Sequence, residues 1–270
     1  MQSHGDRDRT SAVHSRRVGP PARGNRSATA AGRMYPRNAS ALRALVEGML
    51  AGVPVSDDDR LAEAYIAPHG PITMSGRISA QVYARLRHHA AEIDRVILLG
   101  PSHDVREPLT GCIAPAAATW ASPLGRVPID VATVRHMVSD GHVRVDDGPH
   151  RAEYALELQL PFLQIAVPDA VIVPVLVGVT SVADMAVTLA TMASTERTVV
   201  LATTDLGEAR TAGRTLLSIV EMAADRIGDR DACGVYALRG LIRWADHRHL
   251  RAELIAREAD HVACSFVRPD

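Results

Sequence analysis

Several residue types are scarce or missing in this 270-residue chain. All 30 basic residues are arginine, and the absence of lysine excludes any mechanism that needs a lysine Schiff base. Aromatic residues make up 3% of the sequence, so the core must consist mainly of alanine, valine, leucine and isoleucine. The three cysteines, Cys112, Cys233 and Cys264, form no CxxC pair. Their odd number argues against a disulfide framework, and we expect a cytoplasmic protein.

Long apolar runs are also missing, and so are the common motifs for phosphate binding, nucleophilic catalysis and zinc binding. No apolar run reaches the roughly 20 residues that a membrane helix requires. The chain contains no P-loop, GxGxxG, GxSxG or HExxH motif. The net charge of −1 gives no electrostatic basis for binding nucleic acid or an anionic membrane. We therefore expect neither kind of partner.

The composition changes near residue 34. Residues 1–33 are rich in arginine, serine, glycine and proline and contain too little apolar surface to pack, so we expect a disordered N-terminal tail. Residues 34–270 are expected to form one α/β domain, because a hydrophobic content of 47% supports a sizeable core.

Apolar runs typical of strands alternate with stretches of helical periodicity, which predicts βαβ units and a mainly parallel central sheet flanked by helices. The stretch 153–167 is expected to be a buried helix that Pro161 kinks, and 261–267 is expected to close the sheet. The other main strands are expected at 61–67, 95–100, 171–177 and 198–202, with short ones at 110–114 and 126–129. Further helices are expected at 77–91, 131–140, 181–193, 214–227 and 235–245.

Two histidines and an aspartate follow predicted strands. His69 comes just after 61–67, His103 just after 95–100, and Asp205 just after 198–202. The carboxyl ends of parallel strands meet at one edge of a sheet, where α/β proteins bind ligands. Two imidazoles beside a carboxylate or thiolate can hold a divalent transition metal. The simpler alternative is that each histidine caps a strand or lies on the surface.

Cys233 is a second candidate. It is expected in the first turn of a helix capped by Asp231, where the helix dipole favours the thiolate, a nucleophile and a soft metal ligand. The alternative is a small buried hydrophobic residue, which is also the role expected of Cys112 and Cys264.

Glu153 and Glu157 lie one helical turn apart and therefore share a face. They can act as an acid–base pair or support metal ligands. The alternative is that they pair with Arg151 or are solvated.

The order of several short motifs resembles the Memo family, known in bacteria as AmmeMemoRadiSam system protein B. The similarity runs from about residue 34 to the C-terminus. The motifs are MYP at 34–36, PH at 68–69, SG at 75–76, GPSH at 100–103, SPLG at 122–125, LELQLPFL at 156–163, VPVLVG at 173–178, TD at 204–205 and ACG at 232–234.

The resemblance implies a fold similar to the class III extradiol dioxygenases and an iron or copper site held by two histidines and a cysteine. The matching positions are His69, His103 and Cys233. The family name also implies two companion proteins, a radical-SAM enzyme and an AMMECR-type protein.

The sequence departs from the family pattern around this site. The PHAGYxYSG motif reads PHGPITMSG at 68–76, and the EHS motif reads EYA at 153–155, so Tyr154 replaces a histidine. The SSDFSH motif reads TTDLGE at 203–208. Glu208 therefore stands where the dioxygenase relatives carry their acid–base histidine, and Asp205 and Glu208 are the expected catalytic residues.

Two functions agree with these features. The first is a mononuclear iron or copper site with redox or oxygenase-like chemistry, in which Asp205 and Glu208 orient water or substrate. The second is a non-catalytic module that binds a peptide or protein in the same cleft, with the histidines as hydrogen-bond donors.

Overall fold

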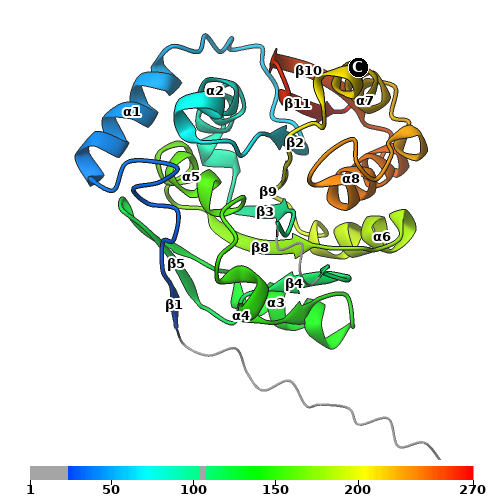
Figure 1. The fold of residues 1–270 in the computed structure, drawn as a ribbon, viewed down its shortest axis with the longest axis horizontal. Helices are drawn as coiled ribbons and strands as arrows, with labels where there is room; N and C mark the ends of the chain where they lie inside the picture. The colour runs from blue at the N-terminus through cyan, green and yellow to red at the C-terminus, as the bar shows by residue number, and fades with distance from the viewer. Residues whose placement is uncertain (1–23, 104–107, 270) are drawn as a thin grey trace, which may run out of the picture.

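A computed structural model describes residues 24–103 and 108–269 (Figure 1). These residues form an eight-stranded central sheet with the strand order β10-β11-β2-β9-β3-β8-β4-β7. The strands are β2 Ala64–Ala67, β3 Arg95–Gly100, β4 Cys112–Ala114, β7 Arg144–Val145, β8 Val171–Val177, β9 Thr198–Thr203, β10 Arg251–Glu258 and β11 His261–Val267. A smaller sheet, of order β1-β5-β6, contains β1 Asn25–Arg26, β5 Thr119–Ser122 and β6 Gly125–Pro128.

The centre of the large sheet is parallel. β2 pairs with β9, β9 with β3, and β3 with β8, all in the parallel sense. β11 runs antiparallel to β2, and β4 runs antiparallel to β8. β2 and β3 are consecutive along the chain, yet β9 lies between them in the sheet. The predicted α/β class and mainly parallel sheet are therefore confirmed, and the three strands that precede His69, Asp205 and His103 end side by side.

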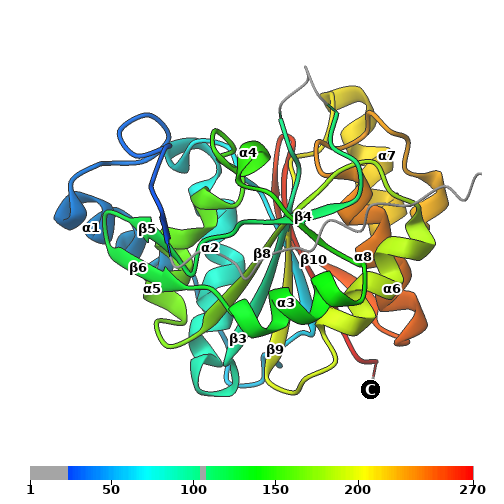
Figure 2. The same cartoon turned by 90° about the horizontal axis from the view of Figure 1, so that it is seen from below.

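Helices cover both faces of this sheet. Figure 2 shows α1, α2 and α5 on one side and α6, α7 and α8 on the other. The longer helices are α1 Ala39–Ala51, α2 Ile72–His88, α3 Val131–Ser139, α5 Leu160–Ala166, α6 Val182–Met192, α7 Ala209–Val220 and α8 Val235–His247. The short ones are α4 Asp147–His150 and the 3-10 turns Ala90–Glu92, Glu157–Gln159 and Ala224–Arg226.

α1 shows how local sequence defines these helices. The side chain of Asn38 accepts a hydrogen bond from the Ala41 N–H and thereby caps the first turn. Leu42, Val46 and Leu50 recur at helical spacing and are all buried against the core.

Three predicted helices begin elsewhere. The helix expected at 214–227 is α7, which begins at Ala209 and ends at Val220. The stretch 153–167 is not one kinked helix, because a turn precedes α5 and Pro161 occupies its first turn. Proline costs little there, since its missing N–H would have no helical partner. α2 begins at Ile72, directly after Pro71, and not near residue 77. Cys112 and Cys264 are buried, as predicted.

The expected N-terminal tail is wrong for its last part, residues 24–33. β1 pairs with β5, and Ala30 is fully buried. The backbone N–H groups of Thr29 and Ala30 donate to the carboxylate of Glu157, which is itself fully buried. The remainder of the expected tail, residues 1–23, lies outside the described residues. Among the described residues, no helix is long and apolar enough to cross a membrane.

We expect a chain that begins at Met34 to be less stable than one that begins at Gly24. The shorter chain leaves the Glu157 carboxylate with the hydroxyl of Tyr35, 2.7 Å away, after the Thr29 and Ala30 donors are lost. Removing partners from a buried charge typically costs about 3–5 kcal/mol. That cost corresponds to a fall of roughly 6–20 °C in melting temperature. Equal melting temperatures by circular dichroism would contradict this role for residues 24–33.

Candidate metal centre

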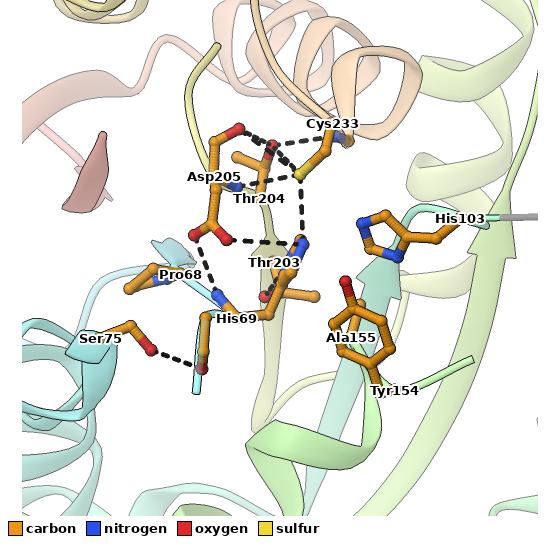
Figure 3. Close-up of polar contacts among 12 residues, drawn as sticks. Pro68, His69, Ser75, His103, Tyr154, Ala155, Thr203, Thr204, Asp205 and Cys233 are labelled. Carbon is orange, nitrogen blue, oxygen red and sulfur yellow. Dashed lines mark hydrogen bonds and ion pairs between the residues drawn. The ribbon is translucent and has the colours of Figure 1, made fainter. Parts of the chain in front are cut away.

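His69 follows β2 in a short loop that leads directly into α2. Its side chain is only 2% exposed. Its backbone N–H donates to Asp205 Oδ1 over 3.1 Å, and ring atom Nδ1 lies 3.0 Å from Thr203 Oγ1, at the end of β9 (Figure 3). The other ring nitrogen, Nε2, lies 3.2 Å from the sulfur of Cys233. Asp205 therefore fixes the backbone of His69, and Thr203 fixes its Nδ1. The other nitrogen, Nε2, faces Cys233.

A hydrogen-bond chain behind Thr203 supports this arrangement. Gln159 donates from Nε2 to Thr203 Oγ1 over 3.0 Å and to the carbonyl of Pro68 over 3.0 Å. The hydroxyl of Tyr83 in turn donates to Gln159 Oε1 over 2.8 Å. Thr203 can accept the Nδ1 proton of His69, which leaves Nε2 of His69 available to a metal.

His103 follows β3 and is held by a buried carboxylate. Its backbone N–H donates to Glu153 Oε2 over 2.6 Å, and Nδ1 lies 2.9 Å from Oε1. Oε1 also accepts the N–H groups of Tyr154 and Ala155, each at 2.8 Å. Burial raises the pKa of Glu153, but the hydrogen bonds and charge of His103 outweigh burial, so the pKa lies below its usual value. Glu153 thus binds Nδ1 of His103 and leaves Nε2 as the ring nitrogen that can bond Cys233 or a metal ion.

Cys233 reaches the same edge of the sheet from the loop before α8. Its backbone N–H donates to the carbonyl of Asp205 over 3.1 Å, and its sulfur accepts the Asp205 N–H over 3.1 Å. Gly234 allows this close approach, because a Cβ at that position would lie 3.0 Å from the Thr203 carbonyl oxygen. The cysteine loop is therefore held against the end of β9 by backbone contacts.

The three predicted metal ligands meet at this edge. His69, His103 and Cys233 each offer one ligand atom, and these three atoms lie within 4.8 Å of one another. They come from three loops that are far apart along the chain. The structure therefore brings together the residues that the sequence marks as the ligand set.

Hydrogen bonds among the three side chains shift their pKa values. Cys233 is exposed as a residue, but the groups packed around its sulfur exclude water and raise the pKa of the thiol. Hydrogen bonds from His103 and His69 outweigh this effect and lower the pKa to about 6. Burial lowers the pKa of His103, but its hydrogen bonds to Cys233 and Glu153 raise the pKa to about 10. Burial also lowers the pKa of His69, but its hydrogen bond to Cys233 outweighs burial and leaves the pKa raised. The cluster thus favours a thiolate on Cys233 and a protonated imidazole on His103, and the pKa of His69 is shifted in the same direction as that of His103.

The expected cause of this acidity is wrong. α8 begins at Val235, after Cys233, and Gly234 occupies its N-cap position. The carboxylate of Asp231 accepts from the Gly228 N–H and makes no cap for this helix. Cys233 is therefore acidic chiefly because of the imidazoles beside it, and not because of a position inside the first helical turn.

The two expected catalytic carboxylates are placed differently. Asp205 belongs to the cluster, since Oδ2 lies 3.8 Å from His69 Nε2 and its side chain is 21% exposed. The carboxylate of Glu208 is 73% exposed and pairs with Arg210 at 2.7 Å. The structure thus brings Asp205, and not Glu208, into contact with the candidate metal ligands.

Tyr154, which the sequence marks only as a lost histidine, lies against the cluster. Its ring stacks on that of His103, with centroids 4.8 Å apart and planes within 5° of parallel. It also meets the His69 ring edge to face at 6.3 Å. Burial and the neighbouring Glu153 carboxylate raise the pKa of Tyr154, so the phenol is neutral.

Glu153 and Glu157 have different roles in the structure, although the sequence suggested a shared one. Neither is solvated, since Glu153 is 5% exposed and Glu157 is fully buried. Glu153 supports His103, as one of the two interpretations of the sequence proposed, whereas Glu157 binds the N-terminal segment. Gln159 and Thr203 carried no sequence signal beyond their place in the shared motifs.

These features define an α/β protein with a candidate His–His–Cys metal centre at the carboxyl edge of a parallel sheet. Residues 26–228 match the family described as Memo-like protein, so the chain belongs to the Memo family. A MEMO1 family protein of Desulfurococcus amylolyticus is 30% identical over 230 residues, which cover 78% of each chain. One of Methanosarcina mazei is 29% identical over 224 residues, covering 78% of this chain and 77% of the relative.

We expect Cys233 to react with iodoacetamide at neutral pH in the native, metal-free protein. Its alkylation rate should rise with pH around a midpoint near 6, because the thiolate is the nucleophile and its pKa is about 6. Burial raises the pKa of Cys112 to about 11 and that of Cys264 to about 12, so neither should react. Mass spectrometry should locate one label at Cys233. A midpoint near the ordinary thiol value of about 8.5 would contradict the hydrogen bonds from the imidazoles.

Proposed function

We propose that this Memo-family protein binds one iron or copper ion through His69, His103 and Cys233 and carries out redox or oxygenase-like chemistry. The observation that carries this proposal is the convergence of the three ligand atoms within 4.8 Å. Metal–nitrogen and metal–sulfur bonds of about 2.0–2.3 Å require ligand atoms roughly 3–4 Å apart. Small movements of these side chains are therefore sufficient to enclose an ion.

The chemistry of the donor set supports the choice of metal. A thiolate with two imidazoles suits iron(II) or copper(I) better than magnesium or calcium, which prefer oxygen ligands. Both histidines are also held through Nδ1, His69 by Thr203 and His103 by Glu153. Such hydrogen bonds orient ligating imidazoles and raise their basicity.

Three protein ligands leave room for a further ligand. When bound, iron or copper supplies a redox couple and an open coordination position. Cys233 is exposed and the side chain of His103 is 31% exposed, so a small molecule can approach from solvent. Asp205 Oδ2 is near His69 and can hold a proton or orient water. We assign no role in this chemistry to Glu208, whose carboxylate pairs with Arg210.

The wider context rests on the family resemblance. A relationship to class III extradiol dioxygenases is consistent with the parallel sheet and the histidines at its edge. The companion radical-SAM and AMMECR-type proteins and a cytoplasmic location remain predictions.

A non-catalytic binding module is the second candidate, and the exposed position of Glu208 favours it. The acid–base histidine expected at this position is absent, and the carboxylate in its place contacts Arg210 and no described residue of the cluster. In that function, His69 and His103 would donate hydrogen bonds to a peptide or protein. Metal content separates the two candidates.

We expect protein purified without oxygen to contain close to one equivalent of iron or copper. Cys233→Ser should contain less than about a tenth of that amount, because the soft thiolate ligand is lost. Cys112→Ala is the matched control, since this cysteine is buried away from the cluster beside Met185. Elemental analysis measures all three proteins. Full metal content in Cys233→Ser would exclude this ligand set, and a metal-free wild type would favour the binding module.

We expect Glu153→Gln to weaken metal binding about 10- to 100-fold, as is typical when a residue that orients a metal ligand is changed. A glutamine cannot accept from all four N–H groups that the carboxylate binds, so His103 loses its fixed orientation. Competition with a chromophoric chelator for Co²⁺ measures the affinity.

Glu157→Gln provides the control for this substitution. Glu157 is equally buried and hydrogen-bonded, but its partners are Thr29, Ala30 and Tyr35. It should lower the melting temperature and leave the Co²⁺ affinity nearly unchanged. Equal losses of affinity in the two variants would show that Glu153 acts through general stability.

A further inference from the structure

The hydroxyl of Tyr154 is directed toward the cluster. Figure 3 shows the phenol beside His103, with its oxygen on the side of His69 and Cys233. The parallel stack on His103 and the edge contact with His69 fix the plane of the ring. The backbone N–H of Tyr154 donates to the Glu153 carboxylate and fixes the backbone from which the side chain extends. The position of the hydroxyl therefore follows from the same contacts that orient the histidines.

This hydroxyl has no hydrogen-bond partner among the described residues, although its neighbours are well bonded. Glu153 Oε1 already accepts three N–H groups. Asp205 Oδ1 accepts the His69 N–H, and the hydroxyl of Thr203 binds His69 and Gln159. The Tyr154 hydroxyl is thus a free donor next to the open side of the candidate metal ligands.

Stacking on His103 does not require this hydroxyl, because a phenylalanine ring would stack equally well. A partly buried hydroxyl with no protein partner is favourable only when water or a ligand accepts its hydrogen bond. A phenol O–H can donate one hydrogen bond to an acceptor atom of a bound molecule.

We propose that Tyr154 is a ligand-binding residue, whose phenol donates a hydrogen bond to an anionic or carbonyl oxygen of a small molecule bound beside His69, His103 and Cys233. This inference rests on the proposed metal site and deepens it. The motif that this chain resembles has a histidine at this position. Tyrosine in its place presents a hydroxyl on the side of His69 and Cys233.

The test uses Co²⁺ as a spectroscopic substitute for the native ion and azide as a small anionic probe. Wild type, Tyr154→Phe and Tyr65→Phe are loaded with Co²⁺ and titrated with azide, followed by visible absorption. Tyr65 is the matched control, because its hydroxyl binds the Ala62 N–H near the opposite end of β2 from His69. Tyr154→Phe should bind azide roughly 10- to 100-fold more weakly, the range expected for losing one hydrogen bond to a charged group.

Two further readouts separate a ligand-binding role from other roles. The Co²⁺ affinity and the thiolate-to-cobalt absorption band should be the same in all three proteins, and Tyr65→Phe should bind azide like wild type. Equal azide affinity in Tyr154→Phe and wild type would overturn the proposal. A loss of Co²⁺ affinity or a shifted thiolate band in Tyr154→Phe would also overturn it, by making the phenol a metal ligand or a structural support.

Failure of the underlying metal site would be visible separately. A wild-type protein that takes up no Co²⁺ would overturn the proposed metal site and, with it, the role of Tyr154. Normal Co²⁺ uptake with unchanged azide affinity would overturn the role of Tyr154 alone.

Discussion

The buried polar side chains of residues 153–159 hold the site and the fold together. Glu153 binds His103, Gln159 binds Thr203 behind His69, and Glu157 binds the N-terminal residues Thr29 and Ala30. Burying a carboxylate or an amide is unfavourable unless its hydrogen bonds are satisfied, so each of these groups strongly favours its observed partners. One short segment thereby fixes both histidines and anchors the start of the domain.

The order of the parallel strands supplies the second constraint. β9 lies between β2 and β3, so the residues after it sit between the loops that carry His69 and His103. Asp205 then bonds the His69 backbone on one side and the Cys233 backbone on the other. An isolated bridge between Leu206 and Ala232 holds the cysteine loop against this strand end. Distant parts of the chain therefore meet through backbone contacts to the end of β9.

The sequence predicts the central strands of the large sheet better than the edge strands. β3 and β8 have the predicted bounds, because continuous apolar runs mark strands buried on both faces. β10, with charges along an edge strand, was not recognised, and neither was β1, which is stabilised by pairing and not by its own apolar content.

Some residues of the candidate site could likewise be predicted from the sequence, and others could not. The strand-end rule indicated where His69, His103 and Asp205 would converge. Cys233 needed the family resemblance, because it lies 164 residues from His69 and outside the helix that suggested it. Motif alignment placed Glu208 along the chain but not the direction of its side chain, which depends on the exposed loop that carries it and on Arg210.

Groups of opposite charge lie next to one another in the cluster. Two protonated imidazoles repel one another, and the charge of His103 indeed opposes protonation of His69. The thiolate of Cys233 lies beside His69 Nε2 and compensates for this repulsion, while Glu153 balances His103 from the other side. A cation placed among the three ligand atoms would have to displace the imidazole protons, whereas the sulfur, with its pKa of about 6, is already ionised at neutral pH.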